Sequence, residues 1–274
     1  MLQRSDTRAS TSRTGQSSSC GLEDRSTVDS NLDRSGYRQV TNALCAPFLR
    51  AVCELHILKR TTLFQEVHTF MNASLPIAPA RVADSSIDEV FLARWSPRAF
   101  DNTSITEAQL MGLLEAARWA PSGLNVQPWR FVYALRGDTH WAPLVASLWP
   151  GNQVWAPKAA ALVAITTQTL FTPPGAPAPV VNPSHAFDAG SAWAHLALQA
   201  TMSGWNVHAM GGFDAAVAAA AIGLPADHAL HAIVAIGKRG LAEQLPEPLK
   251  AREMPSPRRP LAESVFHGAY PAKA

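Results

Sequence analysis

The sequence predicts an α+β domain that runs from about residue 76 to the end of the chain and follows an extension of different composition. Two observations predict this fold class: segments of helical periodicity with clear start signals, and apolar segments of strand length between them. The chain has 274 residues, and 47% of them are hydrophobic. This length allows one large domain or two small ones with an ample core.

The first 75 residues differ from the rest in composition. Residues 1–36 are rich in Ser, Thr and Arg, and such a segment buries too little apolar surface to offset the entropy of ordering. We expect this part to be disordered. The apolar run from Ala43 to Leu58 is compatible with a helix, but polar residues interrupt it too often for a membrane span. A transit peptide is an alternative that the acidic residues argue against, and we favour an extension without a catalytic role.

Two helices with capping boxes open the domain. Residues 86–89, Ser-Ile-Asp-Glu, form the first box, and residues 106–109, Thr-Glu-Ala-Gln, form the second. The leucines after the second box recur at helical spacing, which predicts a buried helical face. Pro121 ends this helix, so the next loop is held between a well-specified helix and a strand over residues 131–135.

Strands and helices alternate in the rest of the domain. Apolar runs of strand length predict buried strands, and a left-handed glycine stop is expected at Gly204. Asp214 is expected to cap an alanine-rich helix. The Pro-dense segment 172–183 must be a loop, which suits a cover over a site. We expect strands over residues 159–166 and 228–237, helices over residues 188–202 and 214–223, and irregular structure over residues 137–157.

Composition and motifs exclude several classes of function. A net charge of +2 gives no field for nucleic acid or an anionic membrane, and the three cysteines all precede residue 71, which leaves the domain without a thiol. No G-x-G-x-x-G follows a strand, so a Rossmann domain is unsupported, and Ser122 lies in no G-x-S-x-G context. His228 and His231 lack a third ligand at suitable spacing, so we expect no metal site.

Two motifs in the first half of the domain carry the chemistry. Arg94, Ser96 and Arg98 offer two guanidiniums and a hydroxyl within five residues, a donor set suited to phosphate. The loop over residues 121–128 is built from Pro, Ser, Gly and Asn, and its amides suit the polar edge of a flat ring. Each motif alone is weak, since the first is more often solvated surface and the second a plain turn. Together they suggest a nucleotide-like cofactor.

In the order and spacing of these motifs the chain resembles the FMN-dependent nitroreductase family. Members of that family carry R-x-S-x-R-x-F, then a helix, then A-P-S-x-x-N-x-Q-P-W-x-F. Here these motifs are residues 94–100 and 120–131, and the match continues to about residue 265. The resemblance implies an α+β, three-layer fold with a central, mostly antiparallel sheet flanked by helices, in a homodimer whose domains entwine.

The resemblance also implies a set of residues that bind FMN. Arg94 and Ser96 would hold the phosphate with a tail arginine, and Arg98 would stabilise the reduced flavin by its fixed charge. The Gly211 backbone N–H would point at flavin N5, so no catalytic side chain is certain. The implied residues are Arg94, Trp95, Ser96, Arg98, Asn152, Gly211, Gly212 and either Arg258 or Arg259, with Pro121, Ser122 and Asn125 from a loop that the other subunit supplies.

The activity implied is that of an FMN-dependent oxidoreductase. It would pass hydride from NAD(P)H through flavin N5 to a nitroaromatic, a quinone or a conjugated carbonyl by a ping-pong mechanism, with Trp149, Trp155 or Phe171 as an apolar wall for the acceptor. Two alternatives stay open: a reductase of small aldehydes or a flavin-fragmenting synthase on the same scaffold, and a non-catalytic interaction module. We expect a cytoplasmic homodimer that binds a small-molecule acceptor and neither nucleic acid nor membrane.

Overall fold

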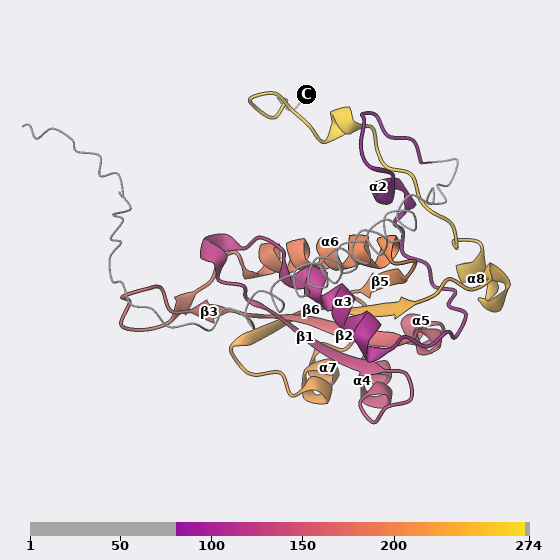
Figure 1. Ribbon diagram of the computed structural model, residues 1–274, viewed down its shortest axis with the longest axis horizontal. Helices are drawn as coiled ribbons and strands as arrows, with labels where there is room; N and C mark the ends of the chain where they lie inside the picture. Colours follow the sequence, from indigo (N-terminus) through magenta and orange to yellow (C-terminus); the bar gives the residue numbers. More distant parts are fainter. Residues whose placement is uncertain (1–80, 272–274) are drawn as a thin grey trace, which may run out of the picture. The chain divides into compact units, whose positions relative to one another are not determined.

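The computed structural model describes residues 81–271, which form an α+β fold with helices on both faces of a sheet (Figure 1). The expectations for the N-terminal extension, and the domain boundary predicted near residue 76, lie outside these residues. In the part of the chain that the structure describes, no helix combines the length and the apolar character needed to cross a membrane.

A four-stranded antiparallel sheet forms the centre of the fold. Its strands are β1 (Trp129–Leu135), β2 (Ala161–Gln168), β5 (Asn206–Met210) and β6 (His228–Gly237), in the order β1-β2-β6-β5. All neighbouring strands run antiparallel. Strand β2 is buried along all but its last residue, which explains why its sequence is a continuous apolar run and not an alternating one. The three predicted strands are confirmed, and β6 has the predicted bounds.

Two helices, α3 (Glu107–Arg118) and α6 (His185–Met202), cover one face of the sheet (Figure 1). The predicted capping box is confirmed: the Gln109 N–H donates to Thr106 Oγ1, and the Gln109 side chain accepts from the Thr106 N–H. Helix α6 begins three residues earlier than predicted and is followed by Gly204 at φ 69°. Both helices bury apolar side chains against β2 and β6, so this layer forms the larger part of the core.

The opposite face carries α4 (Trp141–Ser147) and α7 (Ala215–Ile222) (Figure 1). Asp214 caps α7 as predicted, since its carboxylate accepts the N–H groups of Ala216 and Val217. The prediction of irregular structure over residues 137–157 was wrong, because α4 and α5 (Pro150–Gln153) lie there. Neither helix has a side-chain cap, and α5 carries only Pro150 at its first position as a start signal. Packing of Leu144 and Trp155 in the core stabilises this region.

Three shorter segments position the site. Helix α2 (Glu89–Ala93) begins after Asp88, whose carboxylate accepts the Val90 N–H, so the capping box predicted at Ser86 was wrong: Asp88, an equally good cap, lies nearer the helix. The Pro-dense loop joins β3 (Leu170–Phe171) to β4 (Val180–Val181), which pair as a two-stranded ribbon. After β6 the chain forms α8 (Glu247–Lys250), and its tail returns past α2 (Figure 1).

Candidate functional site

A cavity of about 360 Å³, called the arginine cavity below, lies where residues 94–98, strand β5 and the C-terminal tail meet. Guanidinium groups dominate its lining. The lining residues are Arg81, Arg94, Trp95, Ser96, Arg98, His208, Arg252, Met254, Ser256 and Arg258. Five arginines around one small cavity create a strongly positive potential, and their donor geometry suits a phosphate group.

Arg94 and Ser96 lie next to each other in this cavity, with Arg94 Nη1 donating to Ser96 Oγ at 3.4 Å. Burial, and after it the guanidinium of Arg258, lowers the pKa of Arg94. Arginine nevertheless stays charged in proteins. The lowered pKa shows that Arg94 is partly desolvated and is repelled by Arg258, and a bound anion would offset both effects.

Arg81 belongs to this site although the sequence analysis did not select it. Only 9% of the residue is exposed, and its guanidinium donates to three backbone carbonyl oxygens. Nη1 bonds Leu92 at 2.7 Å and Arg94 at 2.6 Å, while Nε bonds Ser256 at 3.0 Å. Arg81 therefore ties the end of α2 to the tail. Since these partners are backbone atoms brought together by the fold, the local sequence around Arg81 carries no signal for this role.

Glu253, also missed by the sequence analysis, lies in the tail and holds the backbone of residues 94–100, called the arginine motif below. Its Oε1 accepts the N–H groups of Arg98 at 2.7 Å and Ala99 at 2.8 Å. Its Oε2 lies 3.9 Å from Arg98 Nη1 and has no hydrogen-bond partner among the described residues. The side chain is 3% exposed. Two backbone donors and a nearby guanidinium offset the cost of burying this carboxylate, and the contact fixes both segments.

His208 is the third residue of the site that the sequence analysis missed. Its Nδ1 lies 3.0 Å from the Pro97 carbonyl oxygen, and its ring packs against Trp155 at 4.7 Å between centroids and an angle of 43° between ring planes. Burial, and to a lesser degree the charges of Arg98 and Arg94, lowers the pKa of His208 to about 4. The ring is therefore neutral at pH 7, and its Nδ1–H donates to Pro97. This bond anchors the arginine motif to β5.

A second cavity, of about 480 Å³ and called the apolar cavity below, shares Arg94 and Ser96 with the arginine cavity. The rest of its lining is apolar: Phe91, Trp193, Ala194, Ala197, Leu198 and Ala209. His208 and Ala209 are consecutive on β5 and therefore point to opposite faces of that strand. The two cavities thus lie on either side of an edge strand, with Arg94 and Ser96 between them. This arrangement fits a ligand with an anionic end and an apolar body.

The glycine pair after β5 has two different environments. A Cβ at Gly212 would lie 2.9 Å from Asn152 Nδ2 and 3.1 Å from the Trp149 ring, so a side chain would clash there. A Cβ at Gly211 would meet no atom within 4 Å. Asn152 Nδ2 donates to the Gly212 carbonyl at 2.9 Å, which brings Asn152 beside the pair. Gly211 is therefore the position of the pair that faces open space.

Comparison with known proteins identifies the family of this chain. The sequence pattern of the nitroreductase family matches residues 92–238, which is more than half of the chain. The chain belongs to the nitroreductase family. A search among curated proteins found no match.

Several solved structures resemble this nitroreductase family member. An oxidoreductase described as containing FMN is 38% identical, with a TM-score of 0.68 over 72% of this chain and 100% of that one. A protein from Desulfovibrio desulfuricans, designated a nitroreductase and solved in complex with FMN, is 25% identical, with a TM-score of 0.52 over 68% of this chain and 100% of that one. A nitroreductase family protein from Streptococcus pneumoniae, 20% identical, shares the fold with a TM-score of 0.53 over 65% of this chain and 98% of that one.

In this nitroreductase family member the loop with Pro121, Ser122 and Asn125 does not reach the arginine cavity of its own chain. It packs at the start of α6, where the Gly123 N–H lies 3.3 Å from Asp188 Oδ1. The apolar cavity lies farther along the same helix. At 1.5 Å per residue, the five residues from Asp188, which the loop contacts, to Trp193, the nearest residue of α6 that lines the apolar cavity, span about 8 Å. Within one chain, the predicted loop residues are therefore separated from the predicted residues that line the two cavities.

The two candidate tail arginines of the nitroreductase site differ in position. Arg258 lines the arginine cavity, and its Nη1 donates to the Pro257 carbonyl at 3.1 Å. Arg259 is exposed and does not line this cavity. Arg252 lines it as well, beside Arg98, although the predicted set did not contain it. The structure therefore favours Arg258 over Arg259 as the tail residue of the site.

Proposed function

We propose that this nitroreductase family protein is an FMN-dependent oxidoreductase that passes hydride from NAD(P)H to an oxidised acceptor by a ping-pong mechanism. One observation carries the proposal: Arg94 and Ser96 line both a cationic cavity and an apolar cavity. A phosphate in the first and a flat ring in the second is the distribution of charge and apolar surface that FMN has. The family membership and the FMN-containing structures of similar sequence support the same assignment.

The residues that would hold the phosphate are those with free donors toward the arginine cavity. Arg94, Ser96 and Arg258 offer two guanidiniums and a hydroxyl there. Arg81 has a different main task, because three of its five N–H donors bond backbone carbonyls. It positions the segment that carries Arg94, and it adds positive charge to the lining of the cavity.

The glycine pair and Arg98 do not line the apolar cavity, and Arg98 lines the arginine cavity, so their proposed place beside the ring rests on the resemblance to the family. Open space at Gly211 leaves its backbone N–H approachable, while contacts of Trp149 and Asn152 with Gly212 fix the backbone on the other side. Glu253 fixes the backbone at Arg98, so the guanidinium starts from a rigid position. A fixed positive charge favours reduction of a nearby electron carrier. FMN, when bound, supplies the atom that accepts hydride and gives it up again.

We propose that the functional unit is a homodimer. The loop with Pro121, Ser122 and Asn125 lines neither cavity of its own chain, and its contact with Asp188 lies about 8 Å along α6 from Trp193, the first residue of the helix that lines the apolar cavity. In a dimer whose two sites lie at the interface, this loop would complete the site of the partner. The backbone supports such a fixed presenting loop, since Leu124, Asn125 and Gln127 have positive φ values of 51°, 55° and 53°.

We propose a planar acceptor of the nitroaromatic, quinone or conjugated carbonyl class. The structure separates the three aromatic residues considered for its apolar wall. Trp155 is 1% exposed and packs in the core, which removes it as a wall. Trp149 is 59% exposed beside Gly212, and Phe171 lines a cavity of about 410 Å³ next to Leu124. Trp149 is therefore the residue that we place beside the ring within one chain.

The first test is an anaerobic absorption spectrum of the purified full-length protein before and after addition of NADH and then NADPH. A flavin spectrum that bleaches with one of these donors is the expected result, and the donor that bleaches it is the substrate. Reoxidation by a nitroaromatic or a quinone in a second step would then demonstrate the ping-pong order. A colourless protein that takes up no added FMN would overturn the proposal.

A further inference from the structure

A buried threonine hydroxyl lies between two histidine rings at the end of the sheet. Thr167 Oγ1 is 2.8 Å from His185 Nδ1 and 2.7 Å from His231 Nε2. Thr167 has no exposed surface, whereas both histidines are partly exposed. The ring centroids are 5.5 Å apart. The buried hydroxyl is therefore hydrogen-bonded to two imidazoles, and each imidazole is partly exposed to solvent.

An irregularity of the sheet creates this cluster. Ile165 pairs with Ala232 and Thr166 with Leu230, so His231 is an extra residue on β6. Such a bulge shifts the alternation of side chains along the strand. It thereby turns His231 toward the face that carries Thr167 and the first residue of α6, His185. Bulges of this kind recur beside functional sites because they redirect one side chain.

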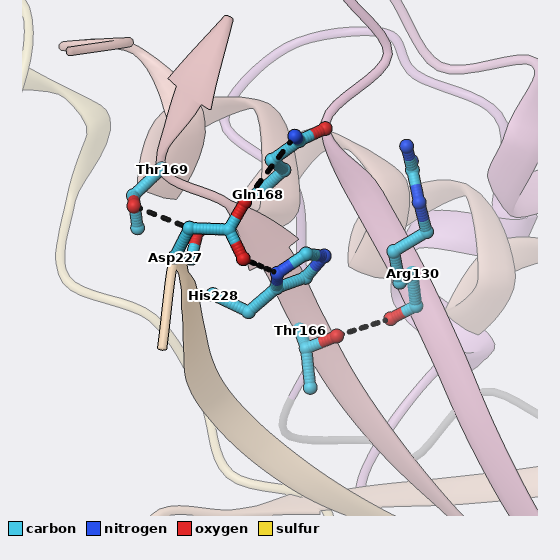
Figure 2. Close-up of polar contacts among 6 residues, drawn as sticks. All are labelled: Arg130, Thr166, Gln168, Thr169, Asp227 and His228. Carbon is cyan, nitrogen blue, oxygen red and sulfur yellow. Dashed lines mark hydrogen bonds and ion pairs between the residues drawn. The ribbon is translucent and has the colours of Figure 1, made fainter. Parts of the chain in front are cut away.

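The neighbouring polar residues are paired in a different way (Figure 2). Thr166, the adjacent buried threonine, donates its hydroxyl to the Arg130 carbonyl at 3.1 Å, which is a plain structural bond. Asp227 binds the His228 ring at 2.8 Å and receives the Gln168 amide at 3.4 Å. Neither arrangement links two titratable rings through one hydroxyl. Thr166 is consequently a matched reference for Thr167.

The hydrogen-bond inventory of the cluster permits two arrangements. A hydroxyl has one proton, so it can donate to one ring and must accept from an N–H of the other. Either Thr167 donates to His185 and accepts from His231, or both bonds are reversed. When His231 Nδ1 takes up a proton, the two bonds can reverse and His185 Nε2 can release one. Only protons move in this exchange, so the cluster has the connectivity of a proton relay.

The His185 end of the cluster lies directly behind the loop that we place at the partner's ring. Ser184, the preceding residue, donates its hydroxyl to Asp188 Oδ2 at 3.0 Å and would touch a Cβ at Gly123. The Gly123 N–H lies 3.3 Å from the other oxygen of Asp188. His185 is therefore attached, through one residue, to the segment that carries Ser122 and Asn125.

We propose that His231, Thr167 and His185 form a relay that delivers the proton consumed when the acceptor is reduced. This inference rests on the proposed function. Each acceptor class takes one proton for every hydride: a quinone becomes a hydroquinone, a nitro group becomes a nitroso group and water, and a conjugated carbonyl becomes saturated. The hydride and its two electrons come from NAD(P)H by way of the cofactor. The proton enters from solvent at His231 and leaves at His185.

The groups around the relay allow it to work near neutral pH. Burial, and after it the charge of His185, lowers the pKa of His231, so this ring is neutral at pH 7. From α6, Asp188 faces the loop and is bonded by Ser184 and Gly123. From the turn before β6, Asp227 is bonded by His228. Since these carboxylates already have partners, the two rings of the relay are each other's nearest titrating neighbours.

Imidazole NMR of the full-length protein tests the relay without any turnover. With and without flavin, nitrogen shifts should show that one of the two nitrogens facing Thr167 carries a proton and the other does not. In Thr167→Val this complementarity should be lost, and the two rings should titrate independently. Thr166→Val should leave the coupling intact. Rings that already titrate independently in the unaltered protein would overturn the inference.

Half-reaction kinetics provide the second test. Thr167→Val should slow flavin reoxidation by nitrobenzene at least tenfold, within the range of proton-transfer effects, and should alter its pH profile. Bleaching by NAD(P)H should be unchanged, and Thr167→Ser should restore the rate. His185→Gln, at a partly exposed position, replaces Thr167→Val if that variant does not fold. Equal reoxidation rates in Thr167→Val and Thr166→Val would refute the relay. Failure of the unaltered protein to bleach would refute the proposed function alone, and the NMR coupling would still decide the relay.

Discussion

The Nδ1 atom of His208 donates to the carbonyl oxygen of Pro97 at 3.0 Å, and this bond fastens the arginine motif to the edge of the sheet. The bond requires no charge on the ring. Burial keeps the pKa of His208 at about 4, well below its usual value near 6.5. The position of the arginines in the cavity therefore depends on a histidine that stays neutral, and the same neutral state affects the stability of the fold.

The first prediction concerns pH. Between pH 6.5 and pH 4 the unfolded chain binds a proton at His208 that the folded chain does not, so the free energy of unfolding falls as the pH falls through this window. From pH 7 to pH 5 the loss due to His208 should be about 2 kcal/mol. Urea unfolding of the protein and of His208→Gln at both pH values measures it. The variant should lose less stability than the parent by this amount, and equal losses would contradict the assigned pKa.

The second prediction concerns Arg94. Arg94→Ala should weaken FMN binding roughly tenfold to a hundredfold, because a charge-assisted hydrogen bond contributes about 1.5–3 kcal/mol. The fold should persist, since the guanidinium bonds only Ser96 among the described residues. Fluorescence titration with FMN measures the affinity, and circular dichroism checks the fold. Arg118→Ala, at an exposed position outside both cavities, is the control and should leave the affinity unchanged.

The third prediction separates the two consecutive tail arginines. Arg258→Ala should lower the affinity for FMN about tenfold, whereas Arg259→Ala should change it less than twofold, because only the first lines the arginine cavity. The two changes are chemically identical and one residue apart, so each controls for the other. Binding of inorganic phosphate to the flavin-free protein should follow the same order. The reverse order would contradict the assignment of Arg258 to the phosphate.

The fourth prediction concerns the loop that packs on α6. A Cβ at Gly123 would lie 2.7 Å from Ser184 Oγ, whose hydrogen bonds with Asn182 and Asp188 resist its displacement. Gly123→Ala should therefore destabilise the protein by about 1–2 kcal/mol. Adding Ser184→Ala should make the effect of Gly123→Ala smaller, a coupling that a double-mutant cycle in urea measures. Gly190→Ala, where a Cβ meets no atom within 4 Å, should be neutral or stabilising.

Local signals account for much of the fold that the sequence predicted. The capping box at Thr106, the cap at Asp214 and the left-handed glycine at Gly204 depend on residues within one turn of each other, and all three are present. The helices α4 and α5 were missed because they lack side-chain caps and depend on burial for their stability. At the start of α2, Ser86 and Asp88 were equivalent as caps, and the chain uses the second.

The same distinction applies to the site: residues of one local motif were predicted, and residues that only the fold brings together were not. Arg94, Ser96 and Arg98 lie within five residues of one motif, and the structure places them together in one cavity. Arg81, His208 and Glu253 were not predictable, because their partners are backbone groups that only the folded tail and the edge strand bring close. The bulge at His231 escaped prediction for a similar reason: the shift exists only in the pairing of β6 with β2.

The separation of the apolar cavity from the Ser122 loop along α6 has a consequence for mixed populations of the protein. In the proposed dimer, each site takes its arginines from one chain and its loop from the other. A chain with a defective cavity and a chain with a defective loop are each inactive alone, yet a pair of them contains one site in which both parts are intact. Co-expression of two such chains should therefore rescue activity in about half of the sites of each hybrid, whereas a site confined to one chain would allow no rescue.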